Sequence, residues 1–152
     1  MKLAEALILR ADSQKRVEQL KQRLSTNARV QEGEAPAEDP KQLLSELDHL
    51  LRELETLVQK INRTNSSVQL QEGQTLSDAL ATRDILKLRR NAYANLAEAA
   101  SVRHDRYTRS EVKFISTVDV SALQKIADDL SKQYRELDSK IQTANWNTEL
   151  AE

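Results

Sequence analysis

The sequence predicts an all-α protein, built as an antiparallel bundle or coiled coil of about four long helices. The 152 residues include only two glycines and two prolines, and the residue types that favour helices dominate the chain. Apolar residues recur at alternating steps of four and three over residues 43–61, which is the spacing of a helical seam. A chain of this length can bury a core as one ordinary domain. We therefore expect a single helical domain over residues 1–152.

The first helix is expected over about residues 2–30. Gln14 interrupts its apolar stripe, which leaves either a polar layer or a partly exposed surface helix. The acidic stretch at residues 31–39 contains Gly33 and Pro36 and ends the helical pattern. This stretch is expected to be a flexible, solvated linker.

The second helix is the best defined element. Asp39 is suited to cap exposed backbone amides, and Pro40 is suited to the first helical position. The seam of this helix consists of Leu43, Leu47, Leu50, Leu54, Leu57 and Ile61. Polar side chains that compete for backbone hydrogen bonds follow the seam, so we expect the helix to end near Arg63 or Asn65.

Two short segments, residues 67–71 and 111–117, are rich in β-branched or aromatic residues. We expect them to pair as a two-stranded ribbon that closes the loop ends of the bundle, with irregular loops as the alternative. The third helix is expected from Ser77 to about Arg103, and its alanine-rich second half favours a close helix or subunit contact. The fourth is expected to begin at Asp119 or Ser121 and to fray near Asn145.

The charge balance argues against several classes of function. There are 23 basic and 24 acidic residues, so no global field attracts nucleic acid or an anionic membrane, and neither is expected as a partner. The chain has no cysteine, and its first residues do not resemble a signal peptide. No apolar run approaches ~18 residues, the length of a membrane span. We expect a soluble, cytoplasmic protein.

Two polar groups are candidate sites. The first joins the end of the second helix to the start of the third, and is either a structural network or a site for a small anion; it consists of Asn62, Arg63, Asn65, Asp78, Arg83 and Asp84. The second is an anion patch in the most basic stretch, and consists of Arg103, His104, Arg106 and Arg109. Capping and solvation near a helix end are the alternative for this patch.

No catalytic constellation stands out. Glu46 and His49 match the Glu-x-x-His spacing of di-iron bundles, but His49 lies on the flank of the leucine seam and no second motif accompanies it. With glycines only at positions 33 and 73, the usual nucleotide-binding loops are absent. We expect no metal, no cofactor and no enzymatic activity.

Four segments rich in polar residues stand out along the chain: residues 61–65, 75–84, 127–130 and 142–146. Together they resemble the pattern of a small bacterial family of unknown function, some of whose members are called septicolysin. The resemblance covers nearly the whole chain and implies the same helical fold. The label implies a cytolysin, whereas the apolar positions here are already used by bundle seams.

The sequence thus predicts a non-catalytic helical bundle that forms a homo-oligomer and has a structural or partner-binding role. Its long, thin helices leave apolar stripes that a second subunit can cover. The alternative is a protein that binds a small anionic or nucleotide-type ligand through the arginine and asparagine cluster. A membrane-active cytolysin is a weaker alternative.

Overall fold

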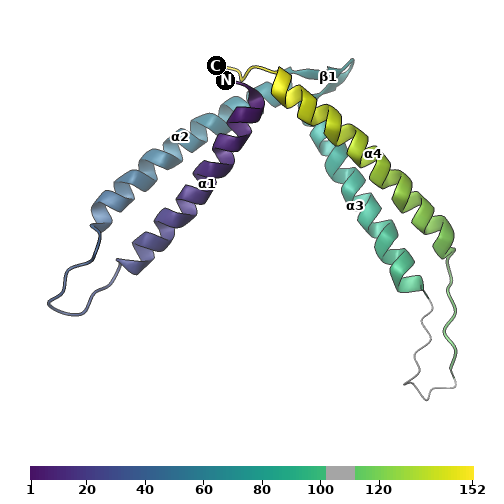
Figure 1. The fold of residues 1–152 in the computed structure, drawn as a ribbon, viewed down its shortest axis with the longest axis horizontal. Helices are drawn as coiled ribbons and strands as arrows, with labels where there is room; N and C mark the ends of the chain where they lie inside the picture. Colours follow the sequence, from purple (N-terminus) through teal and green to yellow (C-terminus); the bar gives the residue numbers. More distant parts are fainter. Residues whose placement is uncertain (102–111) are drawn as a thin grey trace. The chain divides into compact units, whose positions relative to one another are not determined.

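The computed structural model describes residues 1–101 and 112–152. Within these ranges the structure contains four long helices, which pack in two pairs, and a small sheet, which confirms the predicted fold class (Figure 1). The helices are α1 (Leu3–Thr26), α2 (Pro40–Ser67), α3 (Leu76–Ala100) and α4 (Val120–Asn147), and the strands are β1 (Gln69–Gln71) and β2 (Gln74–Thr75). The chain divides into two compact units. The first unit contains residues 1–76 and 142–152, and the second unit contains residues 77–141.

Helices α1 and α2 run side by side in the first unit (Figure 1). Their contact is apolar at both ends. One buried cluster consists of Leu3, Ala6, Ile61 and Leu76, and the other consists of Leu20, Leu43 and Leu50. The leucine seam of α2 therefore faces α1, as its spacing predicts.

The loop between α1 and α2 is tied back to the end of α1. The side-chain amide of Asn27 donates to the carbonyl of Arg23 at 2.8 Å, and its Oδ1 accepts from the backbone N–H of Glu38 at 3.0 Å. The guanidinium of Arg23 also pairs with the Glu38 carboxylate. These bonds satisfy the helix end at Asn27, so α1 is shorter than predicted.

Helix α2 begins as predicted and ends later than predicted. The Asp39 side chain accepts from the backbone N–H of Lys41 at 3.0 Å, and Pro40 occupies the first turn. At the other end, the hydroxyl of Thr64 donates to the carbonyl of Lys60 at 2.8 Å, and that of Ser67 donates to Thr64. These hydroxyls bond back onto the helix, so they do not end it at Arg63 or Asn65.

The predicted strand pairing is wrong. Strand β1 pairs with β2, with Gln69 opposite Thr75, and residues 112–117 form no strand. The chain reverses at Gly73, whose φ of +75° is accessible to glycine at little cost. Closing this short turn costs far less entropy than bringing together segments forty residues apart.

The second unit contains all of α3 except Leu76 and the part of α4 up to Ile141, and the two helices lie side by side there (Figure 1). Small residues of α3, including the buried Ala79 and Ala97, allow a close approach to α4. Helix α4 starts at the predicted cap, because the Asp119 side chain accepts from the backbone N–H of Ala122 at 3.1 Å. The predicted end of the third helix at Arg103 lies outside the described residues.

Candidate functional site

The six residues of the predicted polar network have different surroundings. Arg63, exposed on α2, donates from Nη1 to the backbone carbonyl of Glu152 at 3.0 Å. Arg83 on α3 donates from Nη1 to Oδ1 of Asp138 at 2.8 Å, and its Nε lies 3.6 Å from Oδ1 of Asp84. Of the predicted set, the structure brings Arg83 and Asp84 together. That all six residues form one polar network stays a prediction.

Among the described residues of the second unit, Arg83 is a partly buried cation with a shifted pKa. Its side chain is 23% exposed. Burial alone lowers the pKa of the guanidinium, but the hydrogen bond and the charge of Asp138 outweigh it and raise the pKa above its ordinary value. Arg83 therefore remains charged and holds α3 against α4. Asp138 was not among the residues predicted from the sequence, although it lies one helical turn after Tyr134 and on the same face of α4.

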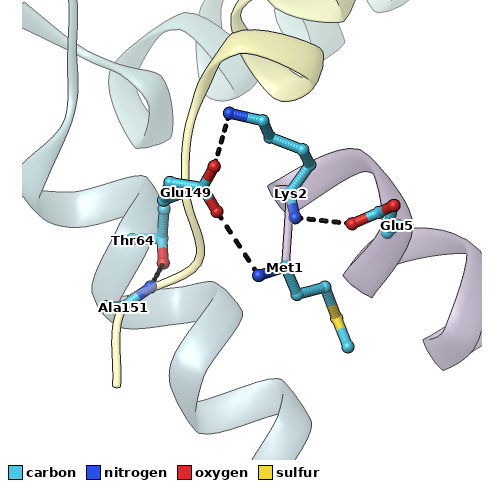
Figure 2. A network of polar contacts seen from close by, with 6 residues as sticks. All are labelled: Met1, Lys2, Glu5, Thr64, Glu149 and Ala151. Carbon is cyan, nitrogen blue, oxygen red and sulfur yellow. Dashed lines mark hydrogen bonds and ion pairs between the residues drawn. The ribbon is translucent and has the colours of Figure 1, made fainter.

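A second polar network joins the two ends of the described chain, and we call it the terminal clasp: residues 1–3, Thr64 and residues 148–151 (Figure 2). Its backbone forms an antiparallel bridge between Lys2 and Glu149. The N–H of Leu3 donates to the carbonyl of Thr148 at 2.9 Å, and that of Leu150 donates to the carbonyl of Met1 at 2.8 Å. The spacing of residues within single helices gives no signal for this contact.

Thr64 connects the terminal clasp to α2. Its hydroxyl accepts from the backbone N–H of Ala151 at 2.9 Å (Figure 2) and donates to Lys60 within the helix. The side chain is buried, with 1% exposed. The hydroxyl thus uses both its donor and its acceptor capacity, which fixes the position of the final residues.

The Glu149 carboxylate forms the ion pairs of the terminal clasp. It pairs with the Lys2 ammonium and with the amino group of Met1 (Figure 2). The hydrogen bond from Lys2 is the largest of the effects that lower the pKa of Glu149, and the bond from the amino terminus follows. This carboxylate is exposed, so solvent screens the pairing.

The lowered pKa of Glu149 predicts a pH-dependent contribution to stability. A carboxylate whose pKa falls on folding stabilises the folded state above its unfolded pKa, and this effect is lost as pH falls through the folded pKa. We expect Glu149→Gln to lower the melting temperature at about pH 7, and the difference from wild type to shrink towards about pH 3.

Thermal melts at several pH values measure this difference. The same substitution in a Lys2→Gln background is the control, because the main partner of Glu149 is then absent and the difference at neutral pH should already be smaller. A difference that stays constant across the pH range contradicts the assignment.

Helix α3 exposes an apolar face, which we call the α3 stripe: Ala81, Ile85, Leu88, Ala92, Leu96 and Ala99. Ile85 is 53% exposed, Leu88 64% and Leu96 45%. Leu88 lies two residues before Arg90, and Ile85 two residues after Arg83, and both arginines bond to α4. Two residues correspond to about 200° around a helix, so the stripe faces away from α4.

The other predicted sites have simple outcomes. His49 is exposed and its Nε2 lies 3.3 Å from Oε1 of Glu53, one turn along α2. No group of three or more potential metal ligands gathers in residues 1–101 and 112–152. The anion patch at Arg103, His104, Arg106 and Arg109 lies outside the described residues.

In the part of the chain that the structure describes, no helix combines the length and apolarity needed to cross a bilayer.

Two comparisons with known proteins found a match, one to a solved structure and one to a family model. A crystal structure of a protein from Corynebacterium diphtheriae, described as conserved and functionally unknown, is 48% identical to this chain. The two superpose with a TM-score of 0.94 over 99% of this chain and 98% of the other. No curated protein matches the sequence. The model of a family of unknown function, DUF6847, matches residues 10–150, and the chain belongs to this family.

Proposed function

We propose that the protein is a non-catalytic, self-associating helical protein and that a second copy covers the α3 stripe. The observation that supports this proposal is the exposure of Ile85, Leu88 and Leu96 along one face of a long helix. Fully burying one such side chain stabilises a contact by about 1.5–3 kcal/mol. Burying these three partly exposed side chains against a second copy would thus stabilise the contact by several kcal/mol. Such an assembly suits a structural or partner-binding role.

The order of residues in the stripe suits an isologous dimer, in which the same surface contributes from both subunits. If two α3 helices pack antiparallel about an axis between positions 88 and 89, Ile85 lies opposite Ala92 of the second copy. Ala81 then lies opposite Leu96, and the two Leu88 side chains meet near the axis. On both sides of the axis a large side chain faces an alanine, which allows close packing, and the two leucines fill the centre.

The same arrangement places Arg89 of both copies near the axis. Arg89 is exposed and adjoins Leu88 in the sequence. Two like charges close to each other oppose association, and dissolved salt screens this repulsion. The dimer contact should therefore be dominated by apolar burial and should strengthen as salt is added.

Leu88→Glu is expected to weaken self-association by at least about tenfold, because it places a charge at the centre of the contact. Light scattering coupled to size-exclusion chromatography, over a range of concentrations, measures the mass. Ile126→Glu is the matched control: it alters a 39% exposed isoleucine on α4 of the same unit, outside the stripe. It should leave the mass unchanged.

A wild-type protein that stays monomeric up to about 100 μM contradicts the proposal. So does a Leu88→Glu variant with the mass of the wild type. Circular dichroism of both variants shows whether the helices are retained. Ligand binding by the cluster around Arg63 and Arg83 stays the first alternative, and the lytic activity that the resemblance to septicolysin implies stays the weaker one.

A further inference from the structure

A cavity of about 320 Å³ lies between α3 and α4 in the second unit. It is lined by Lys87, Arg90, Asn91, Ser131, Tyr134 and Arg135. Three of these side chains are cationic, and none is a carboxylate. The volume is at the lower end of the range for small-molecule sites, which starts at about 300 Å³.

The lining follows a matched spacing on the two helices. Lys87, Arg90 and Asn91 stand at positions i, i+3 and i+4 of α3, so they share one face. Ser131, Tyr134 and Arg135 repeat this spacing on α4. The hydrogen bond between Arg90 and Ser131 shows that these two faces meet. The cavity thus results from the register of α3 against α4.

Arg90 is held in position before any ligand arrives. Its Nε donates to Oγ of Ser131 at 3.3 Å, and its Nη1 donates to Oδ1 of Asn91 at 3.0 Å. The Ser131 hydroxyl in turn donates to the carbonyl of Ala127 at 3.0 Å. A guanidinium that is already oriented loses less entropy when it binds an anion.

The three cations that line the cavity differ from Arg83, in the same unit, in having no carboxylate paired with them among the ion pairs of the described residues. Arg83 is neutralised by Asp138, whereas the ion pairs found within the described ranges leave out Lys87, Arg90 and Arg135. Three converging cations without a carboxylate in the lining favour an anion of more than one negative charge.

We propose that this cavity binds a small phosphate-bearing molecule. Guanidinium groups match the geometry of phosphate oxygens and form paired hydrogen bonds with them, and Lys87 adds a compact positive charge. The ring of Tyr134 and the aliphatic stems of the cations provide an apolar wall for the rest of the ligand. The site is independent of self-association, because the α3 stripe lies on the opposite face of the helix.

Isothermal titration calorimetry with AMP and with inorganic pyrophosphate tests the proposal. We expect saturable binding of at least one of them, with one site per chain. Adenosine, which lacks the phosphate, should bind at least about tenfold more weakly than AMP. Arg135→Gln and Lys87→Gln should each lower the affinity by about tenfold or more, because each removes one charge from the cavity.

Lys125→Gln is the matched control, because it removes an exposed lysine of α4 that is outside the cavity. It should bind the ligand as the wild type does. Melting curves check that each variant is folded. The proposal is overturned if neither phosphate compound binds at about 1 mM, if AMP binds but adenosine binds as tightly, or if Lys125→Gln loses as much affinity as Arg135→Gln. Equal losses of affinity in these two variants would mean that the positive surface of the protein attracts the ligand in general and that the cavity does not bind it specifically.

Discussion

Ile61→Ala is expected to destabilise the first unit by about 2–5 kcal/mol, which is the usual cost of emptying a well-packed aliphatic site. Ile61 is fully buried. It packs in one cluster with Leu3, Ala6 and Leu76, which come from two other helices. Because three helices meet there, the surroundings cannot collapse easily into the space that the substitution leaves.

Urea unfolding with two probes measures this effect. Trp146 is the only tryptophan of the chain and belongs to the first unit, so its fluorescence follows that unit. Circular dichroism follows all the helices. The matched control is Leu51→Ala, which shortens a 41% exposed side chain on the same helix and should cost less than about 1 kcal/mol. Equal losses for the two variants would show that burial of Ile61 is not what stabilises the unit.

Removing residues 148–152 is expected to cost about 3–6 kcal/mol, which is the second large effect. The deletion breaks the backbone bonds of the terminal clasp to Met1, Leu3 and Thr64. Each such bond contributes about 0.5–1.5 kcal/mol. Leu150, which packs against the cluster around Ile61, is lost as well, and this removes about 1–2 kcal/mol of apolar burial.

The same unfolding experiment tests the deletion, since Trp146 is retained. Thr64→Val is the graded control, because it keeps the shape of the buried side chain and removes only its hydroxyl, so that the N–H of Ala151 loses its acceptor. We expect it to cost about 1–3 kcal/mol. A deletion that costs no more than Thr64→Val would show that the remaining bonds of the clasp contribute nothing.

Helix α3 has two faces with different chemistry. The α3 stripe is apolar and exposed, whereas the face towards α4 carries Arg83 and the cationic lining of the cavity. The two proposals can therefore be tested separately. Leu88→Glu should leave phosphate binding unchanged, and Arg135→Gln should leave the mass of the assembly unchanged.

Much of the fold was determined by short-range information in the sequence. The seam of α2 follows from the spacing of its leucines, and the starts of α2 and α4 follow from Asp39 with Pro40 and from Asp119. These features depend on residues within one or two helical turns, where the geometry of the backbone is fixed. For the same reason they can be recognised without a structure.

The tertiary structure alone decided which distant residues meet. It selected Asp138 as the partner of Arg83, Glu149 as the partner of Lys2, and a cavity lined by two matched faces of α3 and α4. Spacing within a helix shows which residues share a face, but it leaves open the register of that face against its neighbour. Register depends on the packing of whole helices and on the turns that join them, so the polar contacts between distant residues could not be predicted from the sequence pattern.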